Sequence, residues 1–362
     1  MAFHPDYRHL VDVVRNRRPA RLPLYEHIIS PTIMEQLLGV QFVGLIGGDQ
    51  ADVDAYLGNY CRFFREMTYD TVSFEVCITT ILPDGGAILG GRPGPIQTRQ
   101  DFERYPWGEL PQRYWKLAAG QFDALARAMP AGMRAVGGVG NGVLEISEDL
   151  VGYEYLAYMA VDDPSLFRDL YRRIGDLMVE LWTSFLERYS SLFPVCRFGD
   201  DLGFKTGTLV SPQTIRRHIL PEYRRVIDLI HGAGSLFLWH SCGNILSIMD
   251  DVIGLGIDAK HSNEDVIAPF ETWIDRFGGR IGLLGGIDVD RLCLDPPDTV
   301  FDWVVAKGTL FREQARGFAL GSGNSIPDYV PVAGYLAMVR AAQQIRETES
   351  GGRLQAEEHV TA

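Results

Sequence analysis

The sequence contains few cysteines, no long apolar run and too few basic residues to balance its acids. Its cysteines are odd in number and widely scattered, at Cys61, Cys77, Cys196, Cys242 and Cys293. This distribution argues against a disulfide framework and favours a reducing, cytoplasmic setting. No apolar stretch approaches the roughly 20 residues that a membrane-spanning helix needs. Residues 1–18 lack the apolar core of a signal peptide.

The excess of acidic residues limits the partners that the chain can bind nonspecifically. The 47 Asp and Glu residues against 34 Lys and Arg residues leave a net charge of −13 at pH 7. Nucleic acids and anionic membranes are themselves negatively charged, so the sequence predicts that the protein binds neither. Hydrophobic residues make up 46% of the chain, which supports a sizeable core and excludes global disorder.

Strand-like and helix-like segments alternate along the chain. Eight segments have the pattern of buried strands: 21–27, 71–77, 133–140, 195–201, 235–243, 259–264, 280–288 and 317–324. Helical patterns lie between them at 51–68, 112–128, 164–188, 212–232, 245–254, 269–277 and 298–315, and a last one covers 327–347. Eight such units predict a single (β/α)8 TIM barrel with elaborated βα loops. We expect the barrel to occupy residues 1–348 and the tail 349–362 to be disordered.

Polar residues close nearly every predicted strand. In (β/α)8 barrels, catalytic groups lie at the carboxyl ends of the strands. Those ends carry Glu26, His27, Glu75, Asn141, Asp200, Asp201, His240, Cys242, Asn263, Glu264, Asp288 and Asn324. A ring of such groups predicts a metal site or an acid–base site. The segment 78–111 is too long for an ordinary connection, and we expect it to cover the barrel mouth with a short hairpin.

His240 and Cys242 form the most specific pattern, since they end an apolar strand and lie two residues apart. Alternate residues of a strand point to the same side, so the imidazole and the thiol converge. Together they are a zinc-favouring ligand pair. The alternative is a packed histidine near a buried free cysteine. Glu26 and Glu75 are candidate further ligands, and the alternative for each is an ion pair with an arginine or lysine.

Two adjacent carboxylates, Asp200 and Asp201, follow the predicted strand 195–201. Adjacent strand residues face opposite sides, so only one of them can face the barrel axis, while the other caps or pairs nearby. We take Asp201 as a candidate catalytic residue. The glycine-rich loop that follows, with Lys205, lacks the lysine–serine pattern of a phosphate-binding loop.

Four short motifs together resemble the uroporphyrinogen decarboxylase superfamily. They are Trp239-His-Ser-Cys-Gly243, Gly285-Gly-Ile-Asp288, Gly199-Asp-Asp-Leu-Gly203, and Gly152-Tyr-Glu154 with Asp163-Pro164. The resemblance spans roughly residues 15–343 and implies a (β/α)8 barrel. It also implies one of two chemistries. Decarboxylases of the superfamily bind an acidic tetrapyrrole without a metal, whereas their zinc-dependent relatives pass methyl groups between corrinoid proteins and thiols or other acceptors.

The residues discriminate between the two branches. The decarboxylases carry an arginine-rich first strand of the type Met-Arg-Gln-Ala-Gly-Arg, which holds substrate carboxylates, whereas this chain has Glu26 in that region. The methyltransferases carry the His-x-Cys pair that His240 and Cys242 match. They take a further cysteine ligand from a Ser-Gly-Cys sequence, where this chain has Asn324. Either Asn324 is a weak oxygen ligand, or Glu26 or Glu75 completes the site, or no metal binds.

We therefore expect a cytoplasmic zinc-dependent methyltransferase. It would move a methyl group between a small-molecule donor or acceptor and a corrinoid on a separate protein, because the chain lacks an Asp-x-His-x-x-Gly corrinoid motif. The expected metal ligands are His240, Cys242 and Glu26, and the expected catalytic residues are Glu26, Glu75, Asp201 and Asn324. A tetrapyrrole carboxy-lyase and a noncatalytic ligand-binding barrel are the alternatives. The sequence leaves open the methyl donor, the direction of transfer and whether the chain forms an oligomer.

Overall fold

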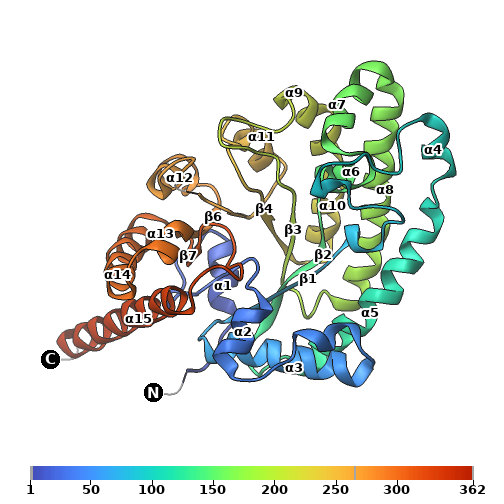
Figure 1. Cartoon of the computed structure of the whole chain (residues 1–362). Helices are drawn as coiled ribbons and strands as arrows, with labels where there is room; N and C mark the ends of the chain where they lie inside the picture. The colour runs from blue at the N-terminus through green and yellow to red at the C-terminus, as the bar shows by residue number, and fades with distance from the viewer. Residues whose placement is uncertain (1–2, 265, 361–362) are drawn as a thin grey trace. The chain divides into compact units, whose positions relative to one another are not determined.

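The computed structural model describes residues 3–264 and 266–360, with the side chains of 352–360 outside the description. The described residues form the strands β1 (Thr71–Cys77), β2 (Arg134–Gly140), β3 (Val195–Gly199), β4 (Leu236–His240), β5 (Ala259–His261), β6 (Gly282–Ile287) and β7 (Phe318–Ser322) (Figure 1). The helices are α1 (Arg8–Val14), α2 (Pro31–Leu38), α3 (Gln50–Glu66), α4 (Arg99–Arg104), α5 (Leu110–Ala128), α6 (Val143–Val151), α7 (Tyr153–Asp162), α8 (Pro164–Tyr189), α9 (Pro212–Thr214), α10 (Leu220–Gly232), α11 (Met249–Gly254), α12 (Phe270–Phe277), α13 (Val289–Leu294), α14 (Pro297–Gln314) and α15 (Val332–Val360).

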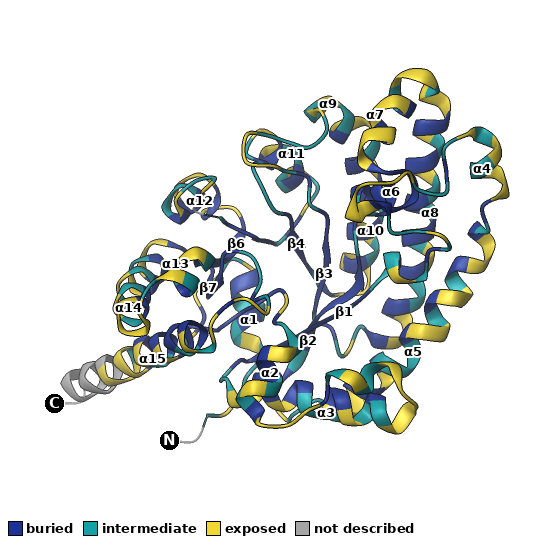
Figure 2. Ribbon diagram, in the orientation of Figure 1, coloured by how far each residue is buried: buried dark blue, intermediate teal, exposed yellow. Residues whose placement is uncertain are grey.

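The fold is α/β, with a sheet whose strands follow the order of the chain from β1 to β7. The pairing is parallel, as Val195↔Leu236 to Gly199↔His240 show for β3 and β4. Residues of β3, β6 and β7 are buried along the whole strand, whereas the outward sides of the helices are exposed (Figure 2). Seven of the eight predicted strands are thus confirmed.

The first predicted strand, 21–27, is the exception, and the closed eight-stranded barrel is therefore wrong for the described residues. This segment makes one isolated parallel bridge, Leu24↔Leu320, and a second, Ile29↔Ile326, lies just after it. The amide of Tyr25 donates to the carbonyl of Leu320 at 2.9 Å, but Pro23 has no amide hydrogen to extend the ladder.

The described chain divides into two compact units. Unit 1 comprises Met1–Ser73, Ala124–Ala135 and Asp258–Ala362, and unit 2 comprises Phe74–Asp123 and Val136–Ile257. Unit 2 contains β3, β4 and most of β1 and β2, and its core includes the packed rings of Phe122, Phe185 and Phe193. Unit 1 contains β5, β6 and β7. The prediction of one domain over residues 1–348 stays a prediction.

The predicted helix starts are confirmed where proline follows a capping side chain. Asp163 accepts the amide of Leu166 at 2.8 Å and begins α8, and Ser211 accepts the amide of Thr214 at 3.0 Å and begins α9. The predicted helix 212–232 is interrupted by a π-helical turn at Ile215–Ile219. Pro221 follows this turn and lacks the amide that an α-helical bond would need, which accounts for the wider turn.

Two further expectations concern the chain outside the strands. The segment 78–111 contains short helices and no strand, so the expected hairpin is wrong. Helix α15 continues through part of the predicted disordered tail, whose last two residues lie outside the described part.

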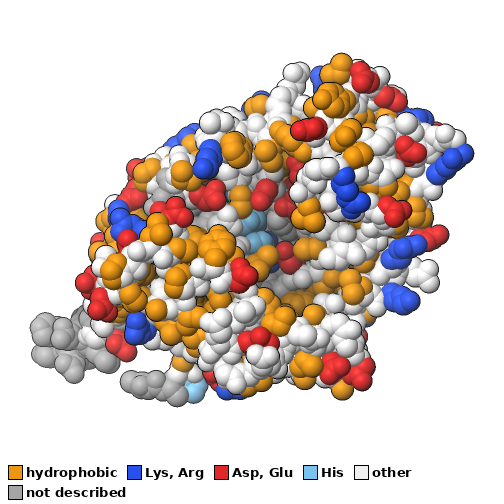
Figure 3. All heavy atoms as spheres, in the orientation of Figure 1, with side chains coloured by type: hydrophobic (Ala, Val, Ile, Leu, Met, Phe, Trp, Pro, Cys, Tyr) orange, Lys and Arg blue, Asp and Glu red, His pale blue; other side chains and the backbone are white. Residues whose placement is uncertain are grey.

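None of the described helices is long and apolar enough to cross a membrane. On the face drawn in Figure 3, basic side chains are scattered rather than gathered into one patch.

Glu26 connects the segment after Pro23 to β7 within unit 1. The side chain is fully buried, its Oε1 accepts the amide of Ser322 at 2.7 Å, and its Oε2 lies 2.5 Å from the Ser322 hydroxyl. Burial raises the pKa of Glu26 to about 8, although both contacts with Ser322 act in the opposite direction. The carboxyl therefore holds a proton at neutral pH.

The close approach of this segment to β7 predicts that Gly321→Ala is destabilising. A Cβ at Gly321 would lie 1.8 Å from the backbone oxygen of Tyr25, so the backbone must shift. We expect the free energy of unfolding in urea to fall by roughly 2–3 kcal/mol. The matched control is Gly58→Ala on the exposed side of α3, where an added Cβ meets nothing within 4 Å. That change should raise stability by up to about 1 kcal/mol; equal stability of Gly321→Ala and wild type would contradict the packing described.

The buried Glu26 predicts a specific pH dependence of stability. Its folded pKa of about 8 lies above the ordinary value of 4.5, so the stabilisation that it provides is complete below pH 4.5 and is lost as pH rises through about 8. Between pH 5.5 and 7.5, the free energy of unfolding should fall by about 1 kcal/mol per pH unit more in wild type than in Glu26→Gln. Urea denaturation in the presence of a chelator measures the free energy of unfolding of both proteins. Parallel pH profiles of wild type and Glu26→Gln would show that Glu26 is not the group responsible.

Candidate metal centre

Parallel pairing of β3 with β4 brings two chain segments together in unit 2. Gly199 is in register with His240, and the amide of Asp200 donates to the carbonyl of His240 at 3.0 Å. The residues that follow each strand therefore leave the sheet side by side (Figure 1). Asp201 lies beside the turn that carries Cys242, and its Oδ1 accepts the amide of Cys242 at 2.8 Å.

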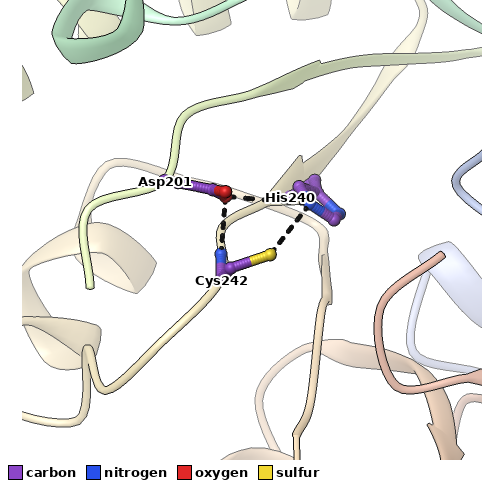
Figure 4. Close-up of side chains that lie close together, drawn as sticks. All are labelled: Asp201, His240 and Cys242. Atoms are coloured by element: carbon purple, nitrogen blue, oxygen red, sulfur yellow. Dashed lines mark hydrogen bonds and ion pairs between the residues drawn. The ribbon is translucent and has the colours of Figure 1, made fainter. Parts of the chain in front are cut away.

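Asp201, His240 and Cys242 converge, and we call these three residues the candidate metal centre (Figure 4). The Sγ of Cys242 lies 3.4 Å from Nε2 of His240, and that nitrogen lies 3.8 Å from Oδ1 of Asp201. One ligand atom from each residue fits within 4.8 Å of the others. The imidazole is buried, whereas the Asp201 side chain is 44% exposed, so the group is accessible from the side of the aspartate.

These distances suit a small metal ion. Bonds of roughly 2.0–2.3 Å around a tetrahedral zinc place neighbouring ligand atoms about 3.3–3.8 Å apart. The observed separations of 3.4 and 3.8 Å agree with this range. Imidazole, thiolate and carboxylate are all zinc ligands, and a catalytic zinc has three protein ligands with a fourth position for water or substrate. The residues present can hold such an ion.

Asp200 has a structural role. The alternation of strand residues predicted such a role for one of the two aspartates. Its carboxylate accepts the amides of Leu144 and Glu145 at 2.9 and 2.8 Å and the hydroxyl of Tyr223 at 2.5 Å. The N-cap residue of helix α6 is Gly142, which has no side chain that could accept the first amides of the helix. Asp200 supplies that cap from another strand. Burial raises the pKa of Asp200 to about 6.

Glu75 is paired with a buried arginine. Nη2 of Arg197 lies 2.8 Å from Oε2 of Glu75, and the Arg197 side chain is fully buried. This is the alternative that the sequence left open for this glutamate. Since a buried guanidinium needs its carboxylate, the pair is costly to separate. Among the described residues, Glu75 is not part of the candidate metal centre, and a catalytic role for it stays a prediction.

Glu26 and Asn324, the other predicted site residues, belong to unit 1. Glu26 is bonded to Ser322 as described above, and Nδ2 of Asn324 donates to Oε1 of Glu264 at 3.1 Å. Their predicted roles as a metal ligand and a catalytic residue are not tested by these contacts and stay predictions.

Two acids of α6, half-buried Glu145 and buried Glu148, were not predicted from the sequence. Burial and the charges of Asp200 and Asp201 raise the pKa of Glu145 well above its ordinary range and that of Glu148 to about 8. Nδ2 of Asn141 donates to Glu145 at 2.8 Å. Their spacing of three on a helix that begins just after a predicted strand end was the available signal. Asp201 supplies negative charge at the candidate metal centre, and a cation bound there would favour the ionised forms of Glu145 and Glu148.

Comparisons with known proteins agree with this fold. The family pattern described as uroporphyrinogen decarboxylase (URO-D) matches residues 63–345. A methyltransferase from Methanosarcina mazei superposes with a TM-score of 0.71 at 16% identity, covering 93% of this chain and 97% of its own. At this identity the likeness concerns the fold alone.

Several other solved structures are less similar. A broad-specificity GH5-4 endoglucanase from an uncultured bacterium has a TM-score of 0.43 and 10% identity, over 82% of this chain and 91% of its own, and supports no argument. None of the curated proteins compared matches the chain. The family match covers most of the sequence and includes all three residues of the candidate metal centre, and the chain therefore belongs to the uroporphyrinogen decarboxylase (URO-D) family.

Proposed function

We propose that this protein is a zinc-dependent methyltransferase. It would move a methyl group between a small molecule and a corrinoid carried by a separate protein. The observation that supports the proposal most directly is the convergence of imidazole, thiol and carboxylate in the candidate metal centre. The similarity in fold to a methyltransferase agrees with it. The five free cysteines agree with the cytoplasmic setting that forms part of the proposal.

Each residue of the candidate metal centre has a defined task in this proposal. His240 offers Nε2 as a neutral ligand, and Cys242 offers Sγ after it has lost its proton. Asp201 offers a carboxylate oxygen while it holds the backbone of Cys242 in place through the 2.8 Å bond to its amide. Bound zinc would make a coordinated thiol or hydroxyl group easier to deprotonate near neutral pH.

An acid of α6 can exchange protons close to this centre. With a pKa of about 8, Glu148 gains and loses a proton close to physiological pH. Glu145, whose pKa is also raised, is held toward Asn141 by the 2.8 Å bond to its carboxylate. Glu26 remains the proposed additional ligand from unit 1, and Glu75 and Asn324 remain proposed catalytic residues.

A tetrapyrrole decarboxylase is the second candidate, because the family as a whole carries that name. Such an enzyme must neutralise several substrate carboxylates. The chain has a glutamate, Glu26, in the region where decarboxylases carry arginines, and buried Arg197 is already paired with Glu75. Glu26 offers no positive charge whether or not it holds its proton, and Glu75 neutralises the charge of Arg197. These residues therefore do not attract an anionic substrate, and they favour methyl transfer.

The proposal predicts about one zinc per chain in protein purified without chelator. His240→Ala, Cys242→Ser and Asp201→Asn should each lower zinc affinity at least about tenfold, because even residues that only support ligands cost 10–100-fold when removed. Elemental analysis measures the content, and cobalt substitution adds the thiolate-to-metal absorption band, which Cys242→Ser should abolish. Cys293→Ser, on α13 and outside the centre, is the matched control. Unchanged zinc content in all three variants would disprove the site.

The proposal also predicts methyl transfer that depends on the same residues. A reduced corrinoid protein with a methylated small molecule, or a methylated corrinoid with an acceptor, should change its absorption spectrum when the enzyme is added. His240→Ala and Cys242→Ser should slow that change by at least about 100-fold, the loss expected when an activating metal is displaced. Uroporphyrinogen decarboxylation, assayed in parallel, should be absent. Robust decarboxylation that persists in Cys242→Ser would favour the second candidate instead.

A further inference from the structure

A cavity of about 370 Å³ lies in unit 1 where β5, β6 and β7 end. Glu264 follows β5, Asp288 follows β6, and Asp290 is in the first turn of α13; all three line the cavity. Of the described residues that line it, none is a lysine or an arginine. The cavity therefore favours a cationic ligand and disfavours an anionic one.

The wall of this cavity is held by backbone bonds between the strand ends. The amide of Asn263 donates to the carbonyl of Gly323 at 2.7 Å, and the amide of Gly323 donates to the carbonyl of Ile287 at 2.6 Å. A Cβ at Gly323 would lie 2.3 Å from the backbone oxygen of Asn263, so glycine is needed for this approach. The lining groups are thus positioned before any ligand binds, which lowers the entropy cost of binding.

One buried acceptor of the lining has no hydrogen bond within the described chain. Asn263 is 2% exposed, and its Nδ2 donates to the carbonyl of Leu284 at 2.7 Å. Its Oδ1 is buried and has no hydrogen-bond partner among the described residues. A buried polar atom without a partner is unfavourable. A ligand N–H that reached this oxygen would satisfy it.

We propose that this cavity binds a small organic ammonium ion that carries at least one N–H, that is, a protonated primary, secondary or tertiary amine. Its N–H would donate to Oδ1 of Asn263, and its charge would face Glu264 and Asp288. Its apolar part would lie against Val289 and the ring of Tyr329. The aromatic ring of Tyr329 can also contact the cation. The proposal concerns binding alone and does not depend on the methyltransferase activity.

Titration calorimetry of the full chain at low ionic strength and pH 7 tests this, with benzylammonium as the probe. Two matched probes separate the contributions to binding. Benzyltrimethylammonium keeps the charge but has no N–H, and benzoate reverses the charge. We expect benzylammonium to bind about fivefold more tightly than the quaternary ion, in line with the loss of one hydrogen bond to a buried acceptor, and benzoate not to bind. Absence of benzylammonium binding, or equal binding of benzoate, overturns the proposal.

Two variants assign the binding to the cavity. Glu264→Gln removes one charge and keeps an oxygen that can accept the bond from Asn324, so the fold should persist. It should weaken benzylammonium binding about fivefold, the size expected for a partly exposed ion pair. Asp275→Asn removes the same charge from an exposed position on α12 outside the cavity and should leave binding unchanged. Equal affinity in Glu264→Gln and wild type overturns the assignment.

Discussion

The parallel register of β3 and β4 is the constraint on which the functional side of unit 2 depends. It sets Gly199 opposite His240 and ties the amide of Asp200 to the carbonyl of that histidine. The contacts among Asp201, His240 and Cys242 depend on this alignment. Asp201 reaches the amide of Cys242 only because the two strands end level with each other. Since both strands are fully or largely buried, apolar packing on both faces holds the register.

Unit 2 holds several acidic side chains near these strand ends. Asp200 is stabilised by two amides and a tyrosine hydroxyl, and Glu75 by the guanidinium of Arg197. Within the described part of the chain, Glu145 and Glu148 form no ion pair, and their pKa values rise so that they hold protons. Groups whose charge is suppressed by burial and by like neighbours are frequent at sites that bind a cation, because the cation relieves the repulsion.

Much of the fold followed from local patterns, because alternating apolar runs and proline-led helix starts act over a few residues. The seven confirmed strands and the caps at Asp163 and Ser211 are of this kind. The segment around Pro23 resembled a strand in its apolar content, but its missing amide hydrogen left only isolated bridges to β7.

The site was predictable only in part. The convergence of His240 and Cys242 needs nothing beyond the two-residue period of a strand. The placement of Asp201 against Cys242 depends on a contact between residues 41 positions apart. Asp200, which follows β3, accepts the first amides of α6, the helix that carries Glu145 and Glu148. No property of the helix sequence by itself indicates that partner.

The two adjacent aspartates have different roles, and this difference restricts how the chain can change over evolution. Asp200 turns inward to the amides of α6, and its neighbour faces the histidine and the cysteine. Insertion or deletion of a single residue after Val195 would exchange the two orientations, because side chains of a strand alternate. One event would then remove the helix cap and the open carboxylate together. Lineages can therefore vary the identity of residues along β3 far more readily than its length, and length variation should accumulate in the connections before and after it.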